Sequence, residues 1–370
     1  MNGEFPNWLL ENNTKLRQLS LVNDSLAGPF RLPIHSHKQL RLLDVSNNNF
    51  QGRIPLEIGD ILPSLKVFNI SMNALDSSIP SSFGNMNFLQ ILDLSNNQLI
   101  GEIPEHLAMG CFNLQFLALS NNSLEGHMFS RNFNLTNLRW LLLEGNHFVG
   151  EIPQSLSKCS SLEGLYLNNN SFSDLSYNRL NGSIPDLVDG LSQLSHLILA
   201  HNNLEVKNIA YTYQGRVVSY LSGLDLSCNK LICHISPQIG NLTRIQTLNL
   251  SHNDLIGTIP STFSNLKHIE SLDLSYNQLN GKIPPQLVEL NTLVVFSVAH
   301  NNLSRKIPEW TAQFATFSES SYEGNHFLCR LPLPICRSPV TMPEASTTNE
   351  ENDNLIDMDN FFIIFTTSYH

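Results

Sequence analysis

Apolar and polar residues alternate in a pattern that recurs along most of the chain every 24 or so residues. Clear copies are LRLLDVSNNNFQGRIP (40–55), LQILDLSNNQLIGEIP (89–104), IQTLNLSHNDLIGTIP (245–260) and IESLDLSYNQLNGKIP (269–284). Their common template is LxxLxLxxNxLxGxIP. The LxL part has a period of two, which predicts a short strand with both leucines in the core and the middle residue outside.

An asparagine follows each predicted strand. Its side chain can hydrogen-bond backbone groups of its own turn and of the neighbouring turn, so stacked asparagines would satisfy buried backbone polar atoms along the array. The template glycine permits the φ angle of a tight turn, and the proline fixes φ in the return segment. We expect the ladder to consist of Asn48, Asn73, Asn97, Asn122, Asn146, Asn170, Asn202, Asn229, Asn253, Asn277 and Asn301.

The repeat unit also predicts the fold class. A single copy has no neighbour against which to bury its apolar faces, so stability has to come from the interfaces between stacked copies. The pattern therefore predicts an α/β repeat solenoid. We expect a curved leucine-rich-repeat superhelix with a parallel β-sheet on its concave side and irregular or 3-10 segments on its convex side.

The regular spacing breaks in the segment NNNSFSDLSYNRLNGSIP, where Asn170 and Asn178 occupy matching contexts eight residues apart. Residues 174–185 match 273–284 at ten of twelve positions, which favours a repeat that has lost its first half over a random insertion. In the frame of Asn178, two core positions would be filled by Asn170 and Ser173, at a cost in unpaired polar groups. We expect Asn170 to keep the ladder and 174–185 to form an over-long convex excursion or an irregular strand.

Composition and charge narrow the class of partner. The formal net charge is −11 and only 14% of the residues are charged. No stretch alternates basic and aromatic residues, which argues against a nucleic-acid partner, because phosphate binding needs clustered Lys and Arg. The N-terminus, MNGEFPNWLLENNTK, lacks the basic start and apolar run of a signal peptide. The C-terminal run Phe361–Phe365 is either a short hydrophobic tail or the start of a truncated membrane span, which needs about 20 residues.

Neither a catalytic motif nor a metal-binding motif is found: GxSxG, HExxH, GxGxxG and the P-loop are all absent. His201, His252 and His300 each precede a ladder asparagine. Two repeats separate His252 from His300, roughly 10 Å, which is too far for both to ligate one metal directly. The acidic residues that recur in LDLS or LDVS are part of the repeat and not paired catalytic acids: Asp44, Asp93, Asp225 and Asp273. We therefore expect no enzyme activity, no metal and no cofactor.

The concave face is the expected binding surface. A polar strip with tyrosine and histidine interspersed suits contact with a peptide or protein. The alternative is that these residues are ordinary variation at exposed repeat positions, without a ligand. The candidate binding residues are Asn249, Ser251, His252, Asp273, Ser275, Tyr276, Ser297 and His300.

Ten N-x-[ST] sequons favour a secreted protein. Asn69 and Asn249 lie between the two apolar residues of a predicted strand, where a glycan would crowd the concave face, so we rank these two lowest. The expected glycosylation sites are Asn12, Asn23, Asn121, Asn134, Asn169, Asn181, Asn241 and Asn302.

Two pairs of cysteines lie within the repeats. Cys111 and Cys159 each stand three residues before the leucine that opens a repeat. They occupy equivalent convex sites two repeats apart, roughly 10 Å, which is too far for a disulfide, so we interpret them as buried thiols. Cys228 and Cys233 can pair or stay free, and the sequence leaves both alternatives open.

The Gly-x-Ile-Pro extension resembles the plant-specific class of leucine-rich repeats. Three further segments resemble plant receptor-like proteins, which are receptors without a kinase domain of their own. NIAYTYQGRVVSYLSGLDLSCNKL (208–231) is similar to the stretch that resumes the repeats after their island segment. SSYEGNHFLCRLPLPIC (320–336) is similar to their C-terminal cap, and NLIDMDNFFIIFTTSY (354–369) to their acidic juxtamembrane piece entering the membrane helix.

The resemblance implies an extracellular recognition module on a single-pass plasma-membrane receptor that signals through a partner kinase. It implies that a peptide, glycan or protein ligand binds the concave face and the island, and that a co-receptor kinase meets the last repeats and the cap. It also implies a cap disulfide between Cys329 and Cys336. Two positions depart from the family pattern, because Arg305 and Arg330 stand where it has glycine.

Compared with the family, the chain is expected to be truncated at both ends and internally. We expect N-terminal repeats without a cap (1–173), whose first repeat exposes an apolar face, then a truncated or irregular repeat and one further repeat (174–204). The remaining expected segments are an island remnant (205–222), C-terminal repeats (223–310), a cap (311–337), an acidic juxtamembrane linker (338–360) and the start of a truncated membrane span (361–370). The alternatives to a receptor module are a soluble leucine-rich-repeat inhibitor or decoy, and a degenerate gene fragment without stable function.

Overall fold

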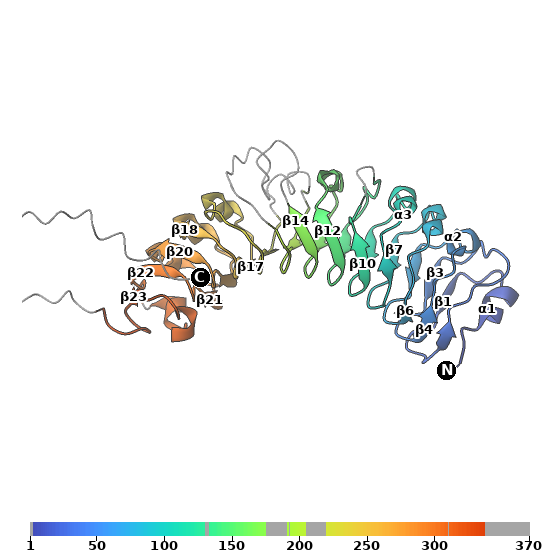
Figure 1. Ribbon diagram of the computed structural model, residues 1–370, viewed down its shortest axis with the longest axis horizontal. Coiled ribbons are helices and arrows are strands. Elements are labelled where there is room, and N and C mark those ends of the chain that lie inside the picture. Colours follow the sequence, from blue (N-terminus) through green and yellow to red (C-terminus); the bar gives the residue numbers. More distant parts are fainter. Residues whose placement is uncertain are drawn as a thin grey trace, which may run out of the picture. The chain divides into compact units, whose positions relative to one another are not determined.

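The computed structural model describes residues 3–129, 133–174, 191, 193–204, 220–309 and 311–336. The chain divides into two compact units, Met1–Ile335 and Cys336–His370, and Cys336 is the described residue of the second. In the first unit the repeats follow one another as the turns of a curved leucine-rich-repeat solenoid (Figure 1). The predicted fold class is thus confirmed.

One side of the solenoid is a parallel sheet to which successive repeats contribute one strand each. In the described residues it has 12 strands in chain order. They are β1 (Gln18–Ser20), β3 (Leu42–Asp44), β5 (Val67–Asn69), β7 (Ile91–Asp93), β9 (Phe116–Ala118), β11 (Trp140–Leu142), β13 (Gly164–Tyr166), β15 (His196–Ile198), β16 (Gly223–Asp225), β17 (Thr247–Asn249), β19 (Ser271–Asp273) and β21 (Val295–Ser297). Leu43 and Val45 are fully buried and Asp44 between them is partly exposed, as the LxL alternation predicts.

Behind the ladder asparagines the chain forms three smaller parallel sheets, which the sequence did not predict. The first comprises β2 (Ala27–Pro29), β4 (Asn49–Gly52) and β6 (Ala74–Leu75). The second comprises β8 (Ile100–Gly101), β10 (Ser123–Gly126), β12 (His147–Glu151) and β14 (Ser171–Asp174), and the third β18 (Ile256–Thr258), β20 (Gln278–Gly281), β22 (Asn302–Lys306) and β23 (Phe327–Cys329). Within each of these sheets, the NxLxG part of one repeat pairs with the same part of the next.

Short helical turns, most of them 3-10, follow the prolines along the outer side of the arc (Figure 1). They are α2 (Ile58–Ile61), η1 (Ser81–Asn85), α3 (Glu105–Gly110), η2 (Gln154–Lys158), η3 (Pro237–Asn241), η4 (Ser261–Asn265) and η5 (Pro285–Glu289). In several of them the preceding proline has a φ near −60°, which fits the entry to a helical turn; Pro260 and Pro104 are examples. The expected convex side is therefore observed.

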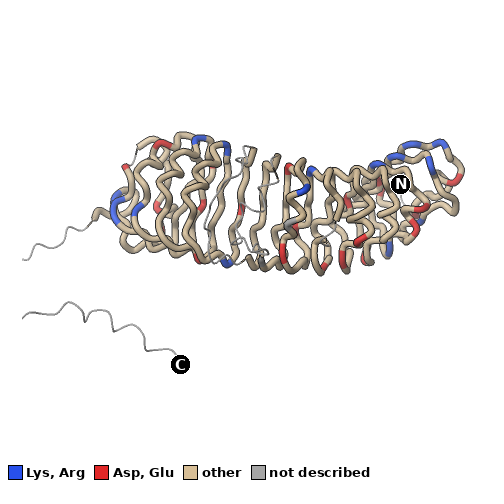
Figure 2. The backbone as a smooth tube through the Cα atoms, turned by 90° about the horizontal axis from the view of Figure 1, so that it is seen from above, with Lys and Arg blue, Asp and Glu red and all other residues tan. Residues whose placement is uncertain are grey.

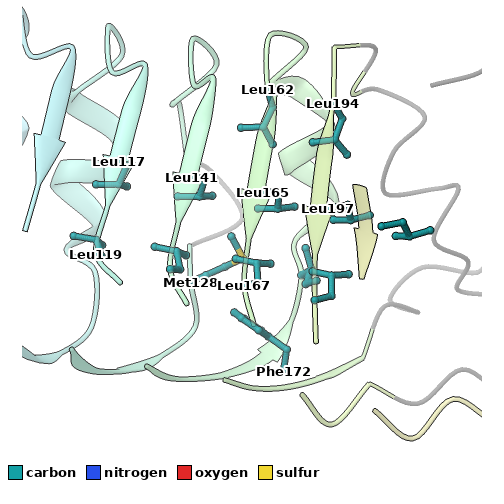
Figure 3. Close-up of a cluster of buried hydrophobic side chains, with 14 of the residues drawn as sticks. Leu117, Leu119, Met128, Leu141, Leu162, Leu165, Leu167, Phe172, Leu194 and Leu197 are labelled. Atoms are coloured by element: carbon teal, nitrogen blue, oxygen red, sulfur yellow. The ribbon is translucent and has the colours of Figure 1, made fainter. Parts of the chain in front are cut away.

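Between the two sides lies one continuous apolar core. Figure 3 shows Leu117, Leu141, Leu165 and Leu197, from neighbouring strands β9, β11, β13 and β15, stacked in a row inside the solenoid. All four are fully buried. Each repeat buries its leucines against the repeats before and after it, so the interfaces stabilise the array.

The N-terminal segment corrects one expectation. The first repeat was expected to expose an apolar face, but α1 (Asn7–Asn12) and the residues before it cover that face. Leu10 and Phe5 are buried, and the Phe5 ring packs against Phe30 and Phe50 with centroids 5.0 and 6.1 Å away. The segment therefore serves as a cap for the first repeat.

In the irregular repeat, Asn170 occupies the ladder position. Its amide oxygen accepts the Phe148 N–H at 3.0 Å, and the next rung is Asn202, which accepts the Phe172 N–H at 3.1 Å. Strand β13 pairs directly with β15. The prediction that Asn170 keeps the ladder is confirmed. Most of the proposed excursion and island remnant, and the two C-terminal segments, lie outside the described residues.

The C-terminal cap closes the other end of the sheet with η6 (Ala312–Ala315), η7 (Glu319–Ser321) and β23. The ring of Phe296 on β21 lies 5.1 Å from that of Phe314 and 5.3 Å from that of Phe317. The Val298 N–H donates to the Ser321 carbonyl at 2.8 Å, so the edge of the last strand is covered. In the part of the chain that the structure describes, no helix has the length and apolar character that crossing a membrane requires.

Candidate functional site: the concave face of the sheet

The asparagine ladder fixes the geometry of the concave face. The Asn277 side-chain amide donates to the carbonyls of Leu250, Leu274 and Ser275 at 3.0–3.2 Å, and its oxygen accepts the Leu255 N–H at 3.0 Å. Every predicted ladder residue makes this set of bonds, and Asn325 in the cap makes it too. Asn325 was missed by the sequence analysis, although it follows Asn301 at the usual spacing within GNHF. Each asparagine thereby ties its own turn to the preceding turn.

The residue before each ladder asparagine has a positive φ. The angles are 53° for His252, 52° for Tyr276 and 52° for His300. Such a left-handed conformation costs a residue other than glycine roughly 1–2 kcal/mol. The repeated turn imposes it, and as a result these side chains form one column along the edge of the concave face.

In the last repeats this column is a stack of rings. The His252 and Tyr276 ring centroids are 4.1 Å apart with planes 11° apart, and the Tyr276 and His300 centroids are 4.3 Å apart with planes 21° apart. The next position is Gly324, where a Cβ would lie 2.5 Å from Nδ1 of His300, so the glycine leaves room for that ring. Tyr276 remains 46% exposed. Among the described residues there is no group of three or more potential metal ligands.

Two of the predicted binding residues are placed differently from the expectation. Ser251 and Ser275 are buried, and their hydroxyl groups donate to Oδ1 of Asn249 and Asp273 at 2.8 and 2.7 Å. The backbone N–H of each serine donates to the same oxygen. These serines therefore close a local turn and do not face a ligand, a role that the recurrent Asp-x-Ser pattern would have indicated. Asn249, Asp273 and Ser297 remain partly exposed, and His252 and His300 are exposed.

The Asp-x-Ser turn is lost in the middle of the sheet. On β9, β11, β13 and β15 the position of the aspartate is taken by Ala118, Leu142, Tyr166 and Ile198. The same four strands carry Trp140 and His196, whose rings lie near that of Tyr166. The concave face thus has an aromatic centre with a polar region on each side, and the sequence analysis missed this centre.

The expected glycosylation sites within the described residues are exposed; Asn181 lies outside them. Asn69 and Asn249, which we ranked lowest, are partly buried. The side-chain oxygen of each accepts the N–H and the hydroxyl group of the serine two residues later. Their amides therefore lie on the sheet surface within a formed turn.

The cysteines offer no reactive thiol in the core. Cys111 and Cys159 are buried and free, and their Sγ–H groups donate to the Phe83 and Leu135 carbonyls at 3.1 and 3.3 Å. Burial raises the pKa of both thiols to about 12, so they stay protonated at neutral pH.

The remaining four cysteines separate into two groups. Cys228 and Cys233, whose pairing the sequence left open, are free. Cys329 and Cys336, which the family resemblance pairs, are both disulfide-bonded.

Comparisons with known proteins agree with the fold. A leucine-rich-repeat family model matches residues 63–124 and 243–303, and a second one matches residues 39–61 and 137–159. Receptor-like protein 15 of Arabidopsis thaliana is 46% identical over 90 residues, which are 24% of this chain and 9% of that protein. The match thus spans a small part of the relative's length.

Solved structures extend the similarity to most of the chain. The ectodomain of the Arabidopsis thaliana plant membrane receptor kinase GASSHO1/SCHENGEN3, in complex with CASPARIAN STRIP INTEGRITY FACTOR 2, has a TM-score of 0.69 at 29% identity, covering 91% of this chain and 44% of that chain. A plant ice-binding protein has a TM-score of 0.54 at 25% identity, covering 82% of this chain and 84% of that one.

The repeats, the ladder and the parallel sheet define the class: this is a leucine-rich-repeat protein. Within that class, the chain is similar to the plant receptor-like proteins of Arabidopsis thaliana over about a quarter of its length.

Proposed function

We propose that this chain is an extracellular ligand-recognition module of a plant receptor-like protein at the plasma membrane, and that it binds a peptide or protein ligand through its concave face. The similarity to Arabidopsis receptor-like proteins and to a receptor ectodomain in complex with CASPARIAN STRIP INTEGRITY FACTOR 2 supports this role. The concave sheet offers a rigid surface, because the ladder fixes the position of every strand.

The observation that carries the proposal is the ring stack of the last repeats. Tyr276 is held on both faces by His252 and His300 and still exposes almost half of its surface. A rigid, half-exposed aromatic group next to hydrogen-bonding groups such as Asp273 and Asn249 is typical of the residues that dominate protein interfaces.

We place a co-receptor kinase on the last repeat and the cap. Large apolar side chains are exposed there, which marks a surface suited to another protein. They are Val294, Val295, Phe327, Leu331 and Ile335.

A peptide library tests the recognition role. The secreted chain is used to select binders from a random peptide library displayed on phage, and each binder is titrated against two variants. Replacing both Tyr276 and Trp140 by alanine strips the concave face of its two main aromatic groups, whereas Ser261→Ala changes the exposed start of η4 on the convex side. We expect selected peptides to lose binding to the double variant and to keep it with Ser261→Ala. Binders that tolerate the double variant would overturn the proposal.

A further inference from the structure

Three rings from three repeats meet at the centre of the concave face. Trp140 on β11, Tyr166 on β13 and His196 on β15 have ring centroids 6.3 Å apart in each of the three pairs. The planes of Trp140 and Tyr166 differ by 26°, those of Trp140 and His196 by 32° and those of Tyr166 and His196 by 21°. All three side chains are partly exposed. We refer to these three residues as the ring triangle.

A glycine makes this arrangement possible. Gly164 stands between Trp140 and His196 in the register of the sheet, so those two side chains have no neighbour between them. A Cβ at Gly164 would lie 2.4 and 2.5 Å from Cε3 and Cζ3 of Trp140 and 3.0 Å from Cε2 of Tyr166. The indole ring therefore occupies the space that a side chain at this position would fill.

The charges on the sheet are of one sign. The outward residues of the described strands, the first and third of each, include no lysine or arginine. They include four carboxylates, on Asp44, Asp93, Asp225 and Asp273. Figure 2 shows that basic residues do occur along the described coil.

The groups next to the ring triangle are also acidic or neutralised. Arg139 precedes Trp140 and donates from Nε to Oε1 of Glu163 at 2.8 Å, so its charge is paired. Glu144 follows β11 by two residues, its Oε2 is buried without a hydrogen-bond partner, and burial raises the pKa of this carboxyl. Burial, followed by the negative charge of Glu144, raises the pKa of Tyr166.

We propose that the ring triangle binds a cationic side chain, arginine in preference to lysine, presented by the polypeptide ligand. This inference rests on the proposed recognition role. A cation is attracted to the face of an aromatic ring within about 6 Å of its centroid, most strongly for tryptophan. The planar guanidinium group of arginine also stacks on such rings, which the compact ammonium group of lysine does not do. The negatively charged carboxylates of the sheet attract the same cationic side chain.

Two matched peptides test the charge. The probes are acetylated and amidated Gly/Ala peptides that are identical except for one central arginine or one citrulline, which has nearly the same shape without the charge. Calorimetric titration at low salt is expected to show the arginine peptide binding about three- to thirtyfold more tightly. The Trp140→Ala variant should lose this preference, whereas Ser271→Ala, at the same row of the sheet on β19, should keep it.

A second variant separates the ring geometry from the integrity of the fold. Gly164→Ala keeps every aromatic group but forces Trp140 to move, since only movable side-chain atoms stand in the way of the new Cβ. It should weaken the arginine peptide severalfold while the circular dichroism spectrum and the melting temperature stay close to those of the unchanged chain.

Several outcomes would overturn the inference. Equal affinity for the two peptides, or a preference that survives Trp140→Ala, would show that the rings do not select a cation. Binding of a neutral glucan oligosaccharide that depends on Trp140, without an arginine preference, would assign the rings to a glycan. If library peptides still require the concave aromatic groups in either case, the recognition role stands and the inference alone fails; if they do not, both fail.

Discussion

The ring of His252 lies on the ring of Tyr276 with centroids 4.1 Å apart, and both residues have φ angles near +50°. Their separation is close to the spacing of about 4.8 Å between neighbouring strands. The stack is therefore a product of the repeat, because the same backbone conformation in consecutive turns places consecutive side chains face to face. It gives the concave face a rigid aromatic edge.

Substitutions at Tyr276 should separate the stabilisation that comes from the ring stack from the conformational free energy that the positive φ costs. Tyr276→Ala loses both ring contacts and keeps the positive φ, so we expect the free energy of unfolding to fall by about 1–2 kcal/mol. Tyr276→Gly loses the same contacts but relieves a conformational cost of roughly 1–2 kcal/mol, so it should be more stable than the alanine variant. Urea unfolding measures both, and an alanine variant as stable as the glycine variant would contradict the expected strain.

The hydrogen bonds of the ladder predict a large loss of stability when Asn277 is replaced. Asn277→Ala removes four hydrogen bonds and leaves the Leu255 N–H and the Leu250 carbonyl without this partner, which we expect to cost about 3 kcal/mol or more. Asn280→Ala is the matched control, because Asn280 is exposed three residues later and should change stability by less than about 0.5 kcal/mol. Thermal unfolding of the two variants compares them, and a similar melting temperature for both would contradict the role of the ladder.

Arg305 stands at a glycine position of the template and has a φ of 79°, within the range of the template glycines such as Gly281 at 76°. Arg305→Gly should therefore raise the free energy of unfolding by about 1 kcal/mol, because glycine adopts this conformation without a Cβ penalty. The neighbouring Lys306→Gly should have the opposite sign and lower it by roughly 0.5–1 kcal/mol, because Lys306 lies within β22 and, unlike Arg305, has no positive φ. Chemical denaturation of both variants measures the change in the free energy of unfolding and tests the two expected signs.

The buried thiol of Cys111 predicts a loss of stability at alkaline pH. Burial raises its pKa from 9.0 to about 12, so the folded chain keeps a proton that the unfolded chain releases above pH 9. Its contribution is fully present below pH 9 and is lost as the pH rises from there towards 12, at roughly 1.4 kcal/mol per pH unit. The pH dependence of unfolding should be flatter in Cys111→Ala by that slope. Identical slopes would place the thiol in contact with water.

Glycosylation should distinguish two sequons of the same repeat. Asn241 is exposed at the end of η3, whereas Asn249 lies on the concave sheet with its oxygen held by Ser251. In a chain produced by a secretory host, we expect mass spectrometry to find a glycan on the Asn241 peptide and none on the Asn249 peptide. A glycan on Asn249 would block the surface to which we assign recognition.

The fold could be predicted from the sequence because its determinants are local and repeated. The strand, the asparagine and the glycine turn lie within one short segment, and each copy carries the same information. The ladder residues could be predicted for the same reason, including Asn170 in the irregular repeat. The binding face was predicted as a surface, but Ser251 and Ser275 were wrongly assigned to it, because their buried hydroxyl groups donate to Oδ1 of the residue two positions earlier.

The sequence by itself determined the solenoid, the strands and the column that carries His252, Tyr276 and His300, because a periodic chain stacks like positions on like positions. Only the tertiary structure decided which unlike positions meet. Trp140 and His196 lie two strands apart, and their rings approach because β13 pairs directly with β15 and because Gly164 has no side chain to hold them apart. Contacts of this kind depend on register and on a missing side chain, and neither is encoded in the repeat.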